Sequence, residues 1–88
     1  MLFRSGNGYF NMADYKNALS FYIKALTIQE AIGNKRGILT SSGAIGNVYL
    51  NLKQFDEAYK YFKRALEIAR EIDSKAGTAS ALISIALL

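Results

Sequence analysis

Four asparagines occur in two pairs that repeat along the chain, and their side chains are the first candidates for chemistry. Asn7 and Asn11 are four residues apart, and Asn47 and Asn51 repeat this spacing forty positions later. Four residues make about one helical turn, so each pair lies on one face of a helix. A primary amide can both donate and accept hydrogen bonds, as a peptide unit does, and each bond contributes about 0.5 to 1.5 kcal/mol net. Asparagine is a poor helix former, so these pairs cost stability.

Two structural alternatives to ligand binding remain open for these amides. They can bond between adjacent helices, and Asn11 and Asn51 can simply end their helices. If the amides do face a ligand, specificity has to come from apolar neighbours. Those neighbours are Phe3, Tyr9, Phe10 and Leu50.

The chain lacks the residue types that most catalytic sites and metal sites need. The chain of 88 residues contains no histidine and no cysteine. This removes the commonest general base, the thiol nucleophile and the usual transition-metal ligands. No glycine-rich phosphate loop or close pair of carboxylates replaces them. We therefore expect no enzymatic activity, no metal and no cofactor.

Composition and charge favour a soluble protein whose partners are proteins. The net charge of +4 comes from 11 basic and 7 acidic residues that are interspersed along the chain, which is typical of a solvated helix surface and not of a nucleic-acid-binding stripe. The apolar segment 76–88 is shorter than the ~20 residues that span a bilayer, and the chain does not open with a signal sequence. We expect a cytoplasmic protein that binds neither nucleic acid nor membranes. Its hydrophobic content of 51% is high for so short a soluble chain, and this favours an apolar surface meant for a partner.

The segment 55–72 has the pattern of an amphipathic helix. Its apolar residues recur at spacings of three and four, which places them on one broad face. They are Ala58, Tyr59, Phe62, Ala65, Leu66, Ala69 and Ile72, with Tyr61 and Ile68 at the margins. A related segment occupies residues 15–32. A face this broad has to pack against two neighbouring helices.

The whole chain repeats with a period of forty residues. Aligning residues 1–48 with 41–88 gives 12 identities, and a period of this size with two helices per unit predicts an α-solenoid. We expect an all-α fold of stacked antiparallel helix pairs with five helices in a single domain, 1–88. Its parts are a first repeat over 1–34, a second over 35–74 and a half repeat over 75–88.

The breaks between the predicted helices carry capping residues. Asp14 and, more weakly, Gln54 are candidate N-caps for the two longer helices. Gly33 precedes Asn34, and Asp73 precedes Ser74. Because glycine tolerates the left-handed conformation and Asn and Ser accept hydrogen bonds from helix N termini, Asn34 and Ser74 are expected to cap the next helices.

The second repeat resembles the tetratricopeptide repeat, a family of paired helices. The residues that carry the resemblance are Ser42, Ile45, Gly46 and Tyr49, followed by Ala58, Phe62 and Ala65. Small Gly46 and Ala58 would let the two helices approach closely, while Tyr49 and Phe62 fill the gaps between pairs. Glu30 and Arg70 stand where the family pattern has proline, and the period is 40 instead of 34. The chain is therefore most similar to the long-repeat branch typified by Leu-Gly-Asn repeat proteins.

The resemblance implies a concave groove lined by the first helix of each repeat. In the family, asparagines at the positions of Asn7 and Asn47 commonly bond the backbone of an extended peptide. Family members that hold acidic chaperone tails carry lysine or arginine one turn earlier. Phe3, Gly43 and Ile83 occupy those places here. We therefore predict a peptide-binding protein that does not recognise acidic C-terminal tails.

The last segment raises a second hypothesis, because residues 76–88 contain no charge and no further helix covers them. The chain is either part of a longer array or associates with other copies of itself through end-to-end stacking or helix exchange. The residues expected to carry self-association are Leu82, Ile85, Leu87 and Leu88. The leading prediction is a protein-interaction module that binds a peptide, and the alternative is a self-assembling structural module.

Overall fold

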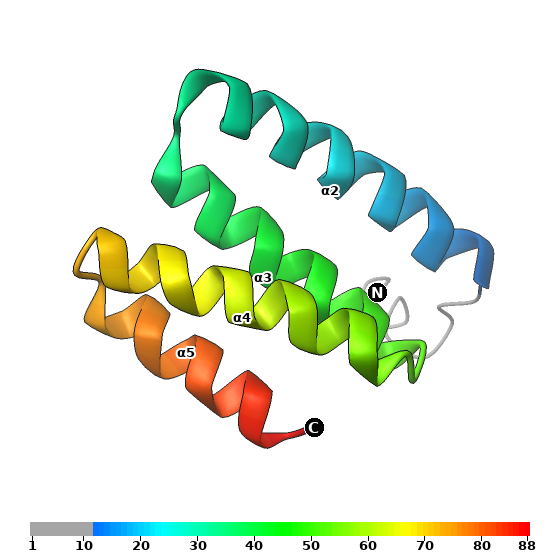
Figure 1. Ribbon diagram of the computed structural model, residues 1–88. Coiled ribbons are helices and arrows are strands. Elements are labelled where there is room, and N and C mark those ends of the chain that lie inside the picture. Colours follow the sequence, from blue (N-terminus) through cyan, green and yellow to red (C-terminus); the bar gives the residue numbers. More distant parts are fainter. Residues whose placement is uncertain (1–11) are drawn as a thin grey trace, which may run out of the picture.

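The computed structural model describes residues 12–88, which form four α-helices and no strand. Helix α2 spans Met12–Ile32, α3 spans Lys35–Asn51, α4 spans Phe55–Glu71 and α5 spans Lys75–Ala86 (Figure 1). The predicted helices over 15–32, 55–72 and 75–88 correspond to α2, α4 and α5. A first helix, and with it the expected number of five, falls in residues 1–11, outside the described residues.

Consecutive helices pack against each other in chain order. Helix α3 contacts α2 and α4, while α5 contacts α4 and, less extensively, α3. The connections are short, so each helix runs back along the one before it (Figure 1). The most extensive contact joins α3 to α4. As a result α4 lies against both α3 and α5, as its broad apolar face predicts.

Two of the predicted caps form as expected. The Asn34 side chain accepts a hydrogen bond from the Gly37 amide at 3.1 Å, and the Ser74 hydroxyl accepts one from the Gly77 amide at 3.0 Å. Each bond satisfies a donor that the first helical turn leaves unpaired. Gln54 occupies the N-cap position of α4 but makes no side-chain capping bond. The cap predicted for Gln54 is therefore not formed by its side chain.

Three residues with positive φ end the preceding helices. Gly33 has a φ of 71°, as its role as a helix stop predicts. Lys53 and Asp73 adopt similar values of 62° and 58°. This conformation costs a residue with a Cβ about 1 to 2 kcal/mol. The chain thus turns through the same backbone conformation between successive helices.

The prediction that Asp14 caps the first long helix is wrong. Helix α2 already includes Met12 and Ala13, so Asp14 lies inside the first turn. Methionine and alanine are strong helix formers, so the helix includes the two residues before Asp14. A carboxylate in the first turn is still favourable, because it faces the positive end of the helix dipole.

The hydrophobic core lies between α2, α3 and α4. Leu26, Ile38, Ile45 and Ile68 form its buried cluster, with several half-buried side chains packed around it. Phe62 is 1% exposed and is the largest of the fully buried side chains. A Cβ added to Gly46 would come within 2.6 Å of the Phe62 ring. The predicted close approach of these two helices at a glycine is therefore present.

Not every residue of the predicted apolar faces is buried. The helical spacing placed Tyr59 on the apolar face of α4, but its side chain is 46% exposed. Among residues 12–88, no helix is both long and apolar enough to cross a membrane.

Ion pairs between residues that are distant in the sequence connect the helices. Glu30 of α2 accepts a hydrogen bond from Arg64 of α4 at 2.8 Å, and Lys35 of α3 pairs with Glu71 of α4. These side chains are roughly half exposed. Solvent-exposed pairs contribute at most about 1 kcal/mol each, so the apolar core carries most of the stability.

Candidate functional site

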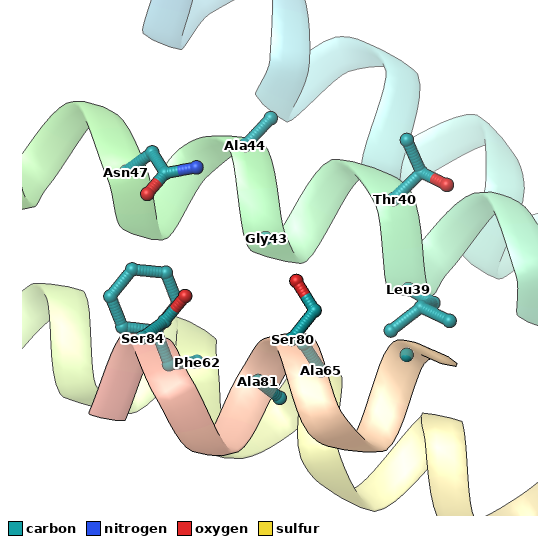
Figure 2. Close-up of a pocket in the computed structure, with 11 residues that line it drawn as sticks. Leu39, Thr40, Gly43, Ala44, Asn47, Phe62, Ala65, Ser80, Ala81 and Ser84 are labelled. Atoms are coloured by element: carbon teal, nitrogen blue, oxygen red, sulfur yellow. The ribbon is translucent and has the colours of Figure 1, made fainter. Parts of the chain in front are cut away.

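The α3–α5 groove is a hollow of about 350 Å³ between α3 and α5, with α4 beneath it (Figure 2). Its α3 wall consists of Leu39, Thr40, Gly43, Ala44 and Asn47. Its α5 wall consists of Gly77, Ser80, Ala81 and Ser84, and Phe62 and Ala65 of α4 form the floor. The lining is uncharged and combines small apolar groups with hydroxyls and one amide. Such a surface can bond a peptide backbone without selecting for a charged side chain.

Small residues keep this groove open. A Cβ added to Gly43 would meet no atom within 4 Å, whereas one added to Gly77 would come within 2.8 Å of Leu39. Gly77 therefore lets the start of α5 approach α3 closely, and Gly43 leaves space further along. Ser80 projects from α5 toward α3 near Gly43 (Figure 2). Because Gly43 has no side chain and Ser80 is small, open space remains between α3 and α5 at this point.

Asn47 lies at the boundary of two hollows. It is exposed, and besides the α3–α5 groove it lines a second hollow of about 250 Å³ between α2 and α3. Its side-chain amide makes no hydrogen bond to any residue among 12–88. An extended ligand crossing α3 at this point would meet a free donor and a free acceptor. The structure thus leaves Asn47 available for the role predicted from the sequence.

Asn51 is less available than Asn47. It is the last residue of α3, and its side-chain nitrogen donates to the backbone oxygen of Asn47 at 3.0 Å. The amide is therefore partly engaged within its own helix, as one of the structural alternatives expected. Its side-chain oxygen remains free to accept, and Asn51 also lines the hollow between α2 and α3.

The other predicted ligand contacts are not gathered in the groove. Leu50 is half-buried and lines neither of the two hollows. The remaining contacts, Asn7, Asn11, Phe3 and Phe10, lie outside the described residues. That the asparagines of the first repeat face the ligand together with Asn47 therefore stays a prediction.

The predicted self-association residues lie at the end of α5 and just beyond it. Leu82, Leu87 and Leu88 are exposed, and Ile85 is partly buried. Ile83, which was not among them, is more exposed than Leu82. The C-terminal part of the chain therefore presents a continuous uncharged and largely apolar surface.

The hydroxyls of Ser80 and Ser84 face α3 in the groove and were not predicted from the sequence. The forty-residue period could have indicated Ser80, because it places this residue at the repeat position of Thr40. Positions that line a wall in one repeat are expected to line it in the next. Asn47, by contrast, corresponds to Leu87, the residue just after α5. The asparagine pattern does not continue into the third unit.

Charged groups gather on the opposite face of the helix layer. A hollow of about 560 Å³ between α2 and α4 is lined by Glu30, Lys60, Lys63, Arg64 and Glu67 together with apolar side chains. Its charges are of both signs, and Glu30 and Arg64 pair directly. This face fits the solvated outer surface predicted from the mixed charges. Among residues 12–88, no group of three or more acidic side chains is placed to hold a metal.

An aromatic pair stands at the far end of α3 and α4. The rings of Tyr49 and Tyr61 stack with their centroids 5.8 Å apart. Burial raises the pKa of the Tyr49 phenol, and the nearby Tyr61 and Glu57 raise it further, partly opposed by Lys60. Both rings pack against the buried cluster of the core.

Paired helices with a groove across them are consistent with a helical-repeat protein. Two family models for the tetratricopeptide repeat match the chain, one over residues 37–88 and one over residues 1–32. The chain belongs to the tetratricopeptide repeat family, as the residue pattern predicted. No characterised protein and no solved structure gave a match. Tetratricopeptide repeats generally mediate protein–protein interactions and are typically non-catalytic.

Proposed function

We propose that this chain is a non-enzymatic protein-interaction module that binds an extended peptide segment of a partner protein in the α3–α5 groove. The observation that carries the proposal is the exposed Asn47 amide, which lines the groove and has no hydrogen-bond partner among residues 12–88. An amide in this position can pair with both the N–H and the C=O of a ligand backbone.

The composition of the groove favours one kind of ligand over others. No charged side chain lines it, and Gly43 stands where a clamp for acidic tails would carry a cation. Thr40, Ser80 and Ser84 add hydroxyls that can donate or accept. An uncharged extended segment with small side chains fits these walls best. The buried area would be small, below about 1,200 Å² in total, so modest affinity is expected.

The forty-residue spacing supports assignment to the long-repeat type. The caps at Asn34 and Ser74 and the positive-φ residues Gly33 and Asp73 stand at matching positions of the two units. We place the chain in this branch for that reason.

The proposal is tested by selecting binders from a random peptide display library and measuring their affinity for variants of the chain. Asn47→Ala removes the amide, and we expect a loss of about 2- to 10-fold in affinity for a bond worth 0.5 to 1.5 kcal/mol. Gly43→Leu places a side chain in open space, so it should block the groove while the chain stays folded.

Asn17→Ala is the matched control, because Asn17 is an exposed helical asparagine that lines neither hollow. Its affinity should equal that of the unchanged chain. Circular dichroism checks that every variant is folded. If the selected peptides bind Asn47→Ala and Gly43→Leu as tightly as the unchanged chain, the groove is not the binding site.

Self-assembly through the terminal helices is a second candidate function. It is favoured by Leu82, Ile83, Leu87 and Leu88, large apolar residues that are all exposed near the end of the chain. Light scattering over a concentration series tests it. A mass that grows with concentration supports assembly, and a constant monomer mass rejects it.

A further inference from the structure

The guanidinium of Arg36 is an exposed charge that no residue among 12–88 neutralises. Arg36 lies in the first turn of α3, and neither an ion pair nor a side-chain hydrogen bond joins it to another described residue. Its neighbour Lys35 is different, because it pairs with Glu71 of α4. The first turns of α3 and α5 contain no acidic residue. The positive charge of Arg36 is therefore available to a partner.

Arg36 continues the line of residues that forms the α3 wall of the groove. Spacings of four, three and four residues lead along this line, so its members lie on one side of the helix. They are Arg36, Thr40, Gly43 and Asn47. The Thr40 hydroxyl donates to the Arg36 carbonyl oxygen at 3.1 Å, as residues one turn apart can. Figure 2 shows the other three members in order along α3, where all of them line the groove.

The uncharged walls of the groove end just before Arg36. Leu39 and Gly77 are the lining residues closest to the starts of α3 and α5. The two helices approach closely at this level, since a Cβ added to Gly77 would come within 2.8 Å of Leu39. Arg36 lies about one turn beyond this contact on α3. A segment that leaves the groove over this end passes the guanidinium.

Polar groups on both walls suit a ligand that runs along the groove. Ser80 and Ser84 lie one turn apart on α5 and face α3 (Figure 2). One helical turn rises 5.4 Å, and two residues of an extended chain span about 6.6 Å. Because these two distances are similar, every second peptide unit of an extended ligand can reach a polar group of the walls.

We propose that Arg36 binds an acidic side chain of the peptide that occupies the α3–α5 groove. The inference rests on the proposed function and adds one feature to its ligand. Asn47 follows Arg36 by eleven residues, which is about 16 Å along the helix axis. An extended chain covers this distance in about five residues. The ligand is thus an uncharged segment with an aspartate or glutamate about five residues from the unit that Asn47 bonds.

The chemistry of the groove sets where the carboxylate can lie. A guanidinium can donate two parallel N–H bonds to one carboxylate. An acidic residue between the uncharged walls would lose water without meeting a cation, which is costly. At Arg36 it meets a cation and keeps its contact with water. This differs from a clamp for acidic tails, since the cation stands beyond the end of the walls and Gly43 leaves none beside Asn47.

Parallel selections on the unchanged chain and on Arg36→Gln test the inference. The probe is a library of random peptides of about twelve residues, long enough to span the groove with residues to spare. Peptides selected by the unchanged chain should carry Asp or Glu enriched at one position, about five residues from an uncharged motif. Arg36→Gln should select the same motif without the acidic preference. Because the Arg36 side chain is exposed, this variant should fold, which circular dichroism checks.

A double-mutant cycle then measures the contact itself. The tightest selected peptide is made with an amidated C terminus, so that only side chains supply a carboxylate. Replacing its acidic residue by the matching amide should lower the affinity about 1.5- to 5-fold, as for an exposed ion pair. Arg36→Gln should do the same, and both changes together should cost no more than one. The loss should shrink as ionic strength rises, because salt screens exposed charges.

Arg70→Gln is the matched control. Arg70 is an exposed arginine of α4 that does not line the groove, and its replacement lowers the net charge by the same unit. This variant should bind the acidic peptide as tightly as the unchanged chain does. If Arg70→Gln loses as much affinity as Arg36→Gln, the effect comes from net charge and Arg36 is not the site.

The outcomes separate this inference from the proposed function. If the selected peptides bind Asn47→Ala and Gly43→Leu as tightly as the unchanged chain, the groove is not the binding site and both fail. If binding depends on Asn47 and Gly43 but Arg36→Gln selects and binds the same acidic peptides, the groove is used and only the role of Arg36 is rejected. A dependence on Arg36 that disappears on amidation would show that a terminal carboxylate is bound, which also overturns the inference.

Discussion

Gly43 and Gly46 lie one turn apart on α3 and should respond in opposite ways to the same substitution. A Cβ at Gly43 would meet no atom within 4 Å, so Gly43→Ala adds a methyl group to open space. Replacing a helical glycine by alanine stabilises a helix by about 1 kcal/mol. We therefore expect Gly43→Ala to raise the free energy of unfolding by that amount.

At Gly46 the same methyl group has no room. It would lie 2.6 Å from two ring carbons of Phe62, whose side chain is 1% exposed and closely surrounded. Overpacking a core costs about 1 to 3 kcal/mol, and two contacts this short place the cost at the upper end. After the gain in helix propensity, Gly46→Ala should lose about 2 kcal/mol.

Urea unfolding followed by circular dichroism measures both effects at a concentration where the chain is monomeric. The two variants should differ by about 3 kcal/mol, or more than 10 °C in Tm for a chain of this size. Phe62→Leu provides the control. It should cost stability in the unchanged chain but much less in the Gly46→Ala background. If Gly46→Ala is as stable as Gly43→Ala, the close packing of α3 on α4 is refuted.

Four further substitutions test other parts of the fold. Asn34→Ala should cost about 1 kcal/mol because it removes a capping bond, whereas Gln54→Ala should change the urea midpoint little, since Gln54 makes no such bond. Ser42→Ala should stabilise the chain by about 1 kcal/mol, because the buried Ser42 hydroxyl has no hydrogen-bond partner among residues 12–88. A loss of stability in urea unfolding would show that the hydroxyl is satisfied. The pKa of Tyr49 is raised by burial, so its phenol ionises in the unfolded chain before it does in the folded one. The free energy of unfolding should therefore fall as pH rises above about 10. Tyr49→Phe should make this fall less steep when unfolding is measured over a pH series, and an equally steep fall in the variant would contradict the assignment.

The helices and their caps were predictable because their causes are local. Asn34 and Ser74 cap helices through hydrogen bonds that span three residues, and Gly33 turns the chain without help from elsewhere. Asp14 shows the limit of this approach. A good capping residue does not begin a helix when the residues before it, here Met12 and Ala13, also favour helix.

Burial and the groove depended on packing between helices, which spacing alone does not set. The helical pattern placed Tyr59 on the apolar face of α4, but its side chain is 46% exposed in the packed structure. Asn47 was identified from its repeat, yet its exposure follows from how closely α5 approaches α3. Gly77 controls that approach through its contact with Leu39, and nothing in the local pattern of either residue indicates the distance.

The geometry of α5 allows peptide binding and self-assembly to occur on the same molecule. Ser80 and Ser84 lie one turn apart and face α3, whereas Leu82 lies two residues from each, about 200° around the helix. The groove and the self-association candidate Leu82 therefore lie on opposite sides of α5. Since each bound peptide would contribute only a small interface, self-assembly would bring several grooves together and multiply the avidity for a repetitive or multivalent partner. The apolar end of the chain would then increase the strength of a groove that is weak in a single copy.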